Sequence, residues 1–305
     1  MTSKVLLLTP PFTQLNTAYP ATAYLKGFLN LINIPSAQAD LGIEVINSIF
    51  SDTGLTQLFD EIDANSPSIS ENAQRIIALQ EDYISTIDAV IRFLQGHEPT
   101  LAHTICRDGF LPEANRFSQI NDLDWAFGTV GIQDKAKHLA TLYLEDIADL
   151  ITECVDEHFG FSRYAERLGR SANSFDELHA SLEKEFSFID SILIDHLAQH
   201  IEREKPQLVA MTIPFPGNLF SALRCGQWLK RHHPNITVTM GGGFVNTELR
   251  SIADARLFEY TNFLTLDDGE SPIEHLLQYI NGRRELSDLR RTFCLLDGKV
   301  TYIDR

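Results

Sequence analysis

Short runs of apolar residues at both ends of the chain predict the strands of a sheet. The first, Val5–Leu8, is continuously apolar, which is typical of a parallel strand that is buried on both faces. Stretches with helical spacing separate these runs, so each strand is expected to lead through a helix into a parallel neighbour. The predicted strands are Val5–Leu8, Ser36–Ala39, Leu208–Thr212, Ile236–Met240 and Phe263–Leu266. This pattern predicts an α/β fold with a doubly wound, Rossmann-like or flavodoxin-like sheet that is mostly parallel.

The middle of the chain carries helical periodicity instead. Apolar residues recur at intervals of three and four across residues 76–94, 139–155 and 178–201, and glycine and proline breaks separate these stretches. Such stripes are typical of helices that pack on a core. We therefore predict a large α-helical insertion over residues 55–204, which divides the α/β domain into a first part at 1–54 and a second part at 205–285.

Two β-prone runs, Phe293–Leu296 and Lys299–Tyr302, flank the pair Asp297-Gly298 near the end of the chain. An Asp-Gly pair between such runs is the strongest short signal for a β-hairpin. No closing helix follows, so residues 286–305 are interpreted as a hairpin or linker that leads toward a further C-terminal domain. The sequence is accordingly expected to be part of a longer polypeptide.

Composition and charge exclude several classes of partner. The chain has 42 acidic and 25 basic residues and a net charge of −17, which argues against binding to nucleic acid or to an anionic membrane surface. No apolar run is long enough to cross a bilayer, and the amino terminus does not have the form of a signal peptide. The four cysteines lie far apart, as expected of reduced thiols. We therefore expect a cytoplasmic protein that contacts neither nucleic acid nor membrane.

The chemistry-bearing residues cluster where two predicted strands end. Gly241–Gly243 follow one strand, and Asp267–Glu270 follow the next. Ligands of open α/β sheets bind outside the carboxyl ends of the strands, and glycines let a ligand approach the backbone. A side chain at Gly242 is therefore expected to block the ligand and to leave the fold intact. Two alternatives remain open: the glycines form a tight turn without a ligand, and the acidic residues cap a helix.

A set of loop motifs resembles one family. They are Thr9–Phe12 after the first strand, Tyr19–Ala21 before the first helix, Thr212–Pro216, Gly241–Glu248 and Asp267–Glu270. Together they resemble the amino-terminal cobalamin (B12)-binding domain of B12-dependent radical SAM enzymes, over roughly residues 1–50 and 205–300. The resemblance does not extend to the helical middle. Asp267 stands where the family more often has a glycine, and this difference weakens the expected close approach of a ligand there.

The resemblance implies a corrinoid at the carboxyl ends of the strands, with its nucleotide tail beside the sheet. Thr212 would face the tail, Gly241–Gly243 would approach the tail and its phosphate, and Asp268–Glu270 would line the last wall. Pro10–Phe12 would lie near the corrin ring. The implied cofactor-binding residues are Pro10, Pro11, Phe12, Thr212, Pro214, Phe215, Gly241, Gly242, Gly243, Asp268, Gly269 and Glu270.

Two motifs of related proteins are absent from the sequence, and their absence limits what the resemblance implies for the cofactors. The loop from Thr9 to Pro20 has no histidine, and the nearest match to the Asp-x-His-x-x-Gly run of other B12 proteins, around His158, lies in the helical middle. The implied cobalamin is thus base-off without a histidine ligand. The C-x-x-x-C-x-x-C run that holds a [4Fe-4S] cluster is also absent. The cluster and S-adenosylmethionine would belong to a C-terminal radical SAM domain of the same polypeptide, with methyl transfer a common activity, and this chain alone is not expected to be active.

Other functions also fit the sequence. The sheet could form a nucleotide- or small-ligand-binding module that does not bind B12. It could instead belong to a nucleotide-type enzyme that uses Asp268 and Glu270 as acid and base. His196 and His200 are four residues apart on one predicted helix; a solvated helix face is expected there rather than a metal site.

Overall fold

The computed structural model describes most of the chain and divides it into two compact units. One unit comprises Met1–Val45 and Gly160–Arg305 and holds the sheet; the other, Ile46–Phe159, is helical. The described residues are 4–13, 15, 18–62, 69–119, 131–161, 165–170, 175–251 and 253–305.

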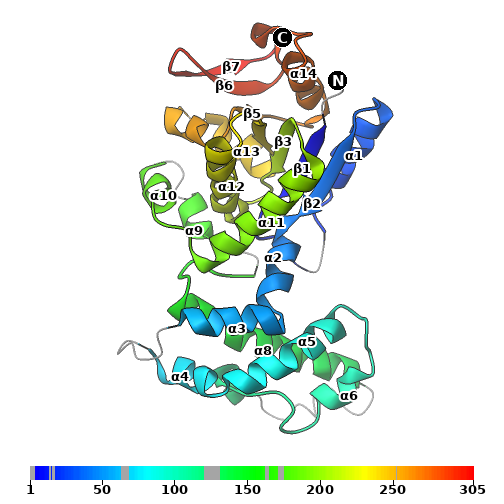
Figure 1. The fold of residues 1–305 in the computed structure, drawn as a ribbon, viewed down its shortest axis with the longest axis vertical. Helices are drawn as coiled ribbons and strands as arrows, with labels where there is room; N and C mark the ends of the chain where they lie inside the picture. Colours follow the sequence, from blue (N-terminus) through cyan, green and yellow to red (C-terminus); the bar gives the residue numbers. More distant parts are fainter. Residues whose placement is uncertain are drawn as a thin grey trace. The chain divides into compact units, whose positions relative to one another are not determined.

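Within the described residues, seven strands form one sheet in the order β2-β1-β3-β4-β5-β6-β7 (Figure 1). Strands β1 to β5 are parallel to one another, whereas β6 is antiparallel to β5 and β7 is antiparallel to β6. The order 2-1-3-4-5 is the flavodoxin-like one, so the predicted fold class is confirmed. The strands are β1 (Val5–Thr9), β2 (Ser36–Asp40), β3 (Leu208–Thr212), β4 (Thr237–Gly241), β5 (Phe263–Thr265), β6 (Thr292–Leu296) and β7 (Lys299–Ile303).

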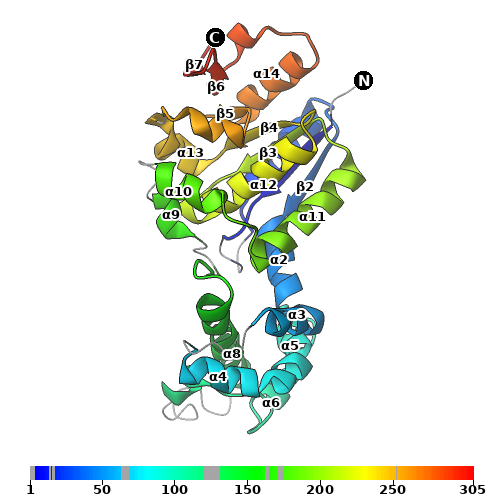
Figure 2. The same cartoon turned by 60° about the vertical axis from the view of Figure 1, so that its left-hand side comes forward.

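Helices cover both faces of the sheet. On one face, α1 and α14 bury Leu29, Ile273 and Leu277 against Leu7 and Ala210 of the strands. On the other face lies α12, whose Gly226 approaches the Met240 side chain; α11 lies beside α12 (Figure 2). The helices of this unit are α1 (Ala21–Leu31), α2 (Leu41–Ile49), α9 (Glu166–Arg170), α10 (Phe175–Leu182), α11 (Phe188–Glu204), α12 (Leu219–His232), α13 (Gly243–Thr247) and α14 (Glu270–Ile280), with 3₁₀ turns η2 (Pro216–Asn218), η3 (Leu249–Ser251), η4 (Ala255–Glu259) and η5 (Leu286–Asp288); the end of α2 already belongs to the helical unit.

The predicted hairpin is present and extends the sheet. Asp297 and Gly298 at its tip have φ angles of 49° and 74°, as a type I′ turn requires, and asparagine, aspartate and glycine tolerate this conformation best. Strand β6 pairs with β5, and Cys294 and Ile303 are buried with Phe263 in one apolar cluster. The hairpin is therefore part of the packed unit.

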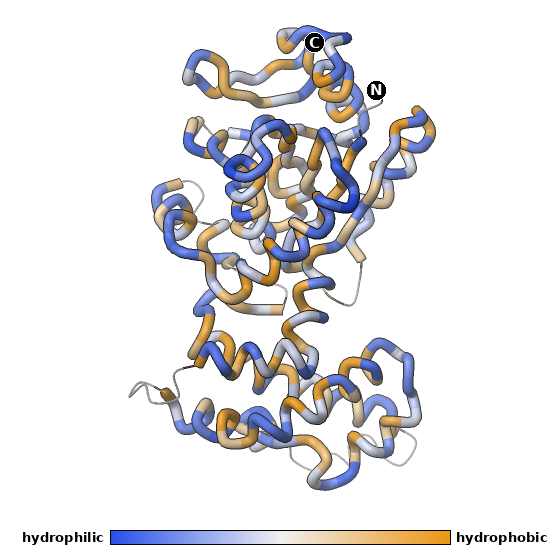
Figure 3. Tube along the Cα trace, viewed as in Figure 1, coloured by the Kyte–Doolittle hydropathy of each residue, from blue (hydrophilic) through white to orange (hydrophobic). Residues whose placement is uncertain are grey.

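The helical unit is held together by amphipathic helices, along which hydrophobic and hydrophilic residues alternate (Figure 3). Its interior includes Tyr83, Tyr143 and Asp146, all fully buried. The Asp146 carboxylate accepts hydrogen bonds from the backbone N–H groups of Ala114 (3.1 Å) and Arg116 (3.0 Å), and burial raises its pKa. The elements are α3 (Asp52–Glu61), α4 (Glu71–Ala78), α5 (Gln80–Leu94), α6 (Leu101–Ile105), η1 (Asn115–Gln119) and α8 (Ile132–Cys154).

The helical unit is shorter than the insertion predicted at 55–204, because α9, α10 and α11 belong to the sheet-containing unit. Periodicity shows that a helix buries one face, but it does not show which neighbour the face packs against. The stripe of α11 packs against α12. Among the described helices of the chain, none is long and apolar enough to cross a membrane.

A buried ion pair joins α11 to α12. Arg224 of α12 is 2% exposed, and its Nε lies 2.9 Å from Oδ2 of Asp190, close enough for an ion pair although the angle is not that of a hydrogen bond. Its Nη1 donates to the carbonyl oxygen of Leu182 at 2.6 Å. The guanidinium also lies 5.0 Å and 5.1 Å from the ring centres of Phe186 and Phe220. Arg224 thus fixes the turn between α10 and α11 to α12.

Candidate functional site

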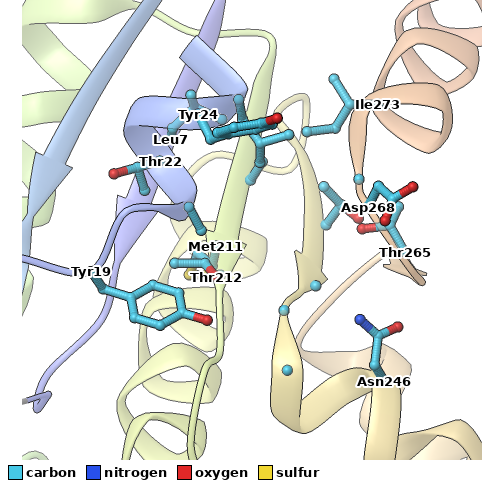
Figure 4. A pocket seen from close by; sticks show the side chains of 18 of the residues that line it. Leu7, Tyr19, Thr22, Tyr24, Met211, Thr212, Asn246, Thr265, Asp268 and Ile273 are labelled. Atoms are coloured by element: carbon cyan, nitrogen blue, oxygen red, sulfur yellow. The ribbon is translucent and has the colours of Figure 1, made fainter. Parts of the chain in front are cut away.

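A pocket of about 320 Å³ opens at the carboxyl ends of the parallel strands, between α1 and α14 (Figure 4). Its floor is formed by β1, β3, β4 and β5, and its walls by the amino-terminal parts of α1 and α14 with Asn246 of α13. Crevices at this edge are where open α/β sheets bind ligands. The fold therefore places a cavity where the sequence predicted one.

The deep end of the pocket is apolar. Leu7, Ala210 and Thr239 lie in one row across the sheet, because β1, β3 and β4 pair in that register. Leu25 of α1 and Ile273 of α14 close the space above them. The small side chains at Ala210 and Thr239 leave room between the sheet and the two helices. The result is a slot with a flat floor and apolar walls.

The outer row of the floor is more polar. It contains Thr212, Gly241 and Thr265 at the ends of their strands. Thr212 is only 6% exposed, and within the described residues its Oγ1 has no hydrogen-bond partner. A buried hydroxyl without a partner is unfavourable, so a ligand atom that bonds to it would be stabilised. Thr212 is thus the polar group in the floor that is best placed to serve a ligand.

Two helices begin beside the pocket. Helix α1 starts at Ala21 with Pro20 as its N-cap, and no side chain caps it; Pro20, Ala21 and Thr22 line the pocket. Helix α14 starts at Glu270 after Gly269, also without a side-chain cap. The first amides of a helix have no intrahelical acceptor and carry partial positive charge, so they favour an anionic group such as a phosphate. The acidic residues of this turn do not cap α14, contrary to the alternative left open by the sequence.

Gly242 has a different role from the one expected. Its φ angle is 106°, and a Cβ there would lie 2.9 Å from both the backbone nitrogen and the backbone oxygen of Ile213. The same Cβ would lie 2.9 Å from Oγ1 of Thr212. The expectation that a side chain at Gly242 would leave the fold intact is therefore wrong, because the protein's own backbone occupies that space. A Cβ on Gly241 would likewise meet Oγ1 of Thr265 at 2.8 Å.

The acidic turn after β5 is braced by neighbouring polar side chains. Oδ1 of Asn246 accepts a hydrogen bond from the backbone N–H of Asp267 at 2.6 Å. The Asp267 carboxylate lies 3.5 Å from Arg250 Nη1 and 3.3 Å from Arg291 Nε. Asp267 has a φ of 62°, so it occupies the left-handed conformation that a glycine would adopt more easily. These contacts hold Asp268 and Gly269 at the pocket.

The pocket brings together about half of the residues expected from the resemblance. Thr212, Gly241, Gly242, Gly243, Asp268 and Gly269 line it. Pro10, Pro11, Phe12, Pro214, Phe215 and Glu270 do not.

The structure shows why the loop residues lie elsewhere. Phe12 is fully buried, and its ring approaches Gly42; Pro10 accepts a hydrogen bond from Nδ2 of Asn218 at 2.7 Å. Pro10–Phe12 are thus buried in the protein and lie outside the pocket lining, and their place near a corrin ring stays a prediction. Phe215 is 52% exposed and packs edge-on against Tyr19, a pocket residue, with ring centres 6.1 Å apart. Tyr19 and Phe215 thus form an aromatic pair beside the pocket.

Sequence reasoning missed the interior of the slot. Leu7, Leu25, Ala210, Thr239 and Ile273 line the pocket, and none of them was predicted to bind a ligand. A signal was present, because Ala210 and Thr239 are small residues at matching positions of two apolar strands. Small residues in adjacent strands leave space above the sheet. That alignment becomes visible only when the register of the strands is known.

His158, His196 and His200 each lie beside a glutamate. His158 belongs to the helical unit and lies 3.9 Å from Glu157. His196 and His200 of α11 both face Glu44 of α2, with His200 Nε2 2.8 Å from the carboxylate, so the expected solvated face is wrong for them. Arg203 Nη2 lies 2.7 Å from His200 Nδ1; because arginine can only donate, Nδ1 accepts and Nε2–H donates to Glu44. Among the described residues, no group of three or more His, Cys, Asp or Glu could hold a metal ion.

The site is thus an amphipathic slot with an apolar deep end, a buried free hydroxyl and uncapped helix amides at its outer end. Such a site suits a ligand that joins a flat apolar ring to an anionic group. Comparison of the chain with protein-family models, curated proteins and solved structures finds no match.

Proposed function

We propose that the slot binds the nucleotide tail of a corrinoid, and that the chain is the cobalamin-binding part of a B12-dependent radical SAM enzyme. The observation that carries the proposal is the slot itself, which runs along the sheet between α1 and α14 and ends at free polar groups. The motifs that resemble the family supply Thr212 and the glycines of the same pocket.

The deep end fits the benzimidazole base of the tail. Leu7, Ala210 and Ile273 offer an apolar floor and wall, and a flat bicyclic ring buries most of its surface in such a slot. The volume of about 320 Å³ lies near the lower end for ligand pockets. It suits a base and part of its sugar, so the corrin ring would lie outside, on the side of Tyr19 and Phe215.

The outer end fits the phosphate of the tail. The Thr212 hydroxyl is available to donate, and the amides at Ala21 and Thr22 carry the partial positive charge of the α1 amino terminus. Hydrogen bonds from these groups would fix the tail and orient the attached ring. The net charge of −17 makes such local donors important, because the chain as a whole repels an anion.

A bound corrinoid supplies a cobalt centre for group transfer or radical chemistry. The residues of this chain would bind the tail, exclude water from the base and set the orientation of the ring. With its base in the slot the cobalamin is base-off, and no histidine in the loop from Thr9 to Pro20 replaces that base. A [4Fe-4S] cluster and S-adenosylmethionine would need ligands outside the 305 residues of this chain, which has no C-x-x-x-C-x-x-C run.

Filling the slot tests the proposal. Leucine in place of Ala210 puts a branched side chain in the deep end, because Ala210 lies on the floor between Leu7 and Thr239. We expect the affinity of Ala210→Leu for cobalamin to fall to its affinity for cobinamide, a corrinoid without the nucleotide tail. Equilibrium dialysis with absorbance detection measures both affinities.

Ala39→Leu is the matched control. Ala39 lies in β2 beside Leu8, on the other face of the sheet, and does not line the pocket. The exchange adds the same volume to a buried strand position and causes similar overpacking. It is expected to leave the preference for cobalamin over cobinamide unchanged. Undiminished cobalamin binding by a folded Ala210→Leu protein would contradict the assignment of the slot.

A further inference from the structure

We infer that the slot selects the base of the corrinoid tail: it accepts an apolar benzimidazole and discriminates against a purine. This inference rests on the proposed function and goes beyond it, because corrinoids with either kind of base would satisfy the shape of the pocket. The observation that carries it is the set of hydrogen-bonding groups at the deep end.

The threonine hydroxyls near the deep end are already committed. Thr239 Oγ1 donates to the carbonyl oxygen of Phe263 at 3.3 Å, and Thr265 Oγ1 lies 3.5 Å from the carbonyl oxygen of Met240. A hydroxyl has one proton, so neither group keeps a donor for a ligand. Both retain acceptor capacity only.

Several other polar groups of the pocket lie toward its outer end. The side-chain oxygen and nitrogen of Asn246 bond to the backbone of Asp267, and the Asp267 carboxylate faces Arg250 and Arg291. Thr212, with its free hydroxyl, is one row further out than Ala210 along β3. Tyr24 of α1 also lines the pocket near Leu7 (Figure 4), but it is 73% exposed, so its hydroxyl bonds to solvent. Among the described lining residues, the buried part of the deep end therefore offers apolar surface without a free side-chain donor.

A purine and a dimethylbenzimidazole differ at the edge of the base that would enter the deep end of the slot. The benzimidazole edge carries methyl groups, whereas a purine carries ring nitrogens that accept hydrogen bonds and, in adenine, an amine. Ring nitrogens that lose water without gaining a donor are left unpaired, and each such group weakens binding. We therefore expect at least about tenfold weaker binding for an adenine tail, the size expected for one buried unpaired polar group.

Three corrinoids separate this inference from the proposed function: cobalamin, the corrinoid with an adenine tail, and cobinamide. The expected order of affinity is cobalamin first, with the other two at least about tenfold weaker. Equal or tighter binding of the adenine-tailed corrinoid would overturn the selectivity while leaving the corrinoid assignment standing. If cobalamin binds no better than cobinamide, the proposed function fails instead, and the selectivity fails with it.

A variant that adds a hydrogen-bond donor to the slot tests the inference in the opposite direction, because it should reduce the selectivity. Leu25 lies on α1 above the slot and is partly buried, and glutamine has a similar helix propensity and length. Its amide can both donate and accept, so Leu25→Gln is expected to reduce the preference for cobalamin over the adenine-tailed corrinoid by several-fold. Leu25→Met, which adds no donor, is the matched control and is expected to keep the preference. A preference unchanged in a folded Leu25→Gln protein, with cobalamin still bound, would contradict the inference.

Discussion

Replacing Gly242 by alanine is expected to weaken cobalamin binding by at least about tenfold and to lower the free energy of unfolding by about 1–3 kcal/mol. The φ angle of 106° with ψ near −178° is a conformation that essentially only glycine adopts. The added Cβ would also meet the Ile213 backbone and the Thr212 hydroxyl at 2.9 Å. Relieving that contact must move the turn that leads into α13. The hydroxyl and the glycine amides would then leave the positions proposed for the phosphate.

Gly27→Ala is the matched control for this exchange. Gly27 lies inside α1, and a Cβ there would meet no atom within 4 Å. Alanine is the better helix former, so the control is expected to be about 0.5–1 kcal/mol more stable than the original chain and to bind cobalamin equally well. Urea unfolding and equilibrium dialysis give the two quantities. A Gly242→Ala protein as stable as the Gly27→Ala protein would refute the assigned role of Gly242.

The second large effect concerns Arg224. Replacing it by methionine is expected to lower the free energy of unfolding of the sheet-containing unit by about 3–5 kcal/mol. Methionine fills much of the volume between Phe186 and Phe220, but it leaves the Asp190 carboxylate buried without its positive partner. The backbone carbonyls of Ser181 and Leu182 also lose the hydrogen bonds that Arg224 donates, although Leu182 keeps one from Gln227 Nε2. Burial of an unpaired charge is the main cause of the loss.

A double-mutant cycle of Arg224→Met and Asp190→Asn isolates the cost of leaving the Asp190 charge buried without a partner. Asp190→Asn removes the negative charge and keeps an oxygen that can accept the Ser187 N–H, which forms part of the cap of α11. The double variant is therefore expected to be more stable than Arg224→Met alone. Trp228 on α12 reports unfolding of this unit once Trp125, the other tryptophan of the sequence, is replaced by phenylalanine. A double variant less stable than Arg224→Met would show that packing, rather than the buried charge, dominates.

Most strands of the sheet could be predicted well because they are short and largely apolar runs; β2, with the sequence Ser-Ala-Gln-Ala-Asp, is the exception. Val5–Leu8 and Leu208–Thr212 are recognisable by themselves, and Asp297-Gly298 identifies the hairpin. The boundary of the helical unit could not be predicted in the same way. The stripe of α11 has the same periodicity as the helices of the second unit, and only its partner, α12, places it with the sheet.

Only the part of the candidate site that depends on local sequence was predicted. The glycines Gly241–Gly243 and Thr212 were found because they lie at the carboxyl ends of strands, where ligands bind. The slot depends on strand register, which aligns Ala210 with Thr239 and Leu7. Phe12 is a different case: the resemblance placed it near the corrin ring, and its side chain is fully buried in the protein, outside the pocket lining.

Binding of cobalamin by the unmodified chain tests the central claim most directly. We would titrate the protein with hydroxocobalamin and cob(II)alamin and follow the corrinoid absorbance spectrum. The proposal predicts saturable binding of one corrinoid per chain with a base-off spectrum, because a base in the slot beside Ala210 cannot coordinate cobalt. An unchanged spectrum with no saturable binding, or saturable binding with a base-on spectrum, would contradict it.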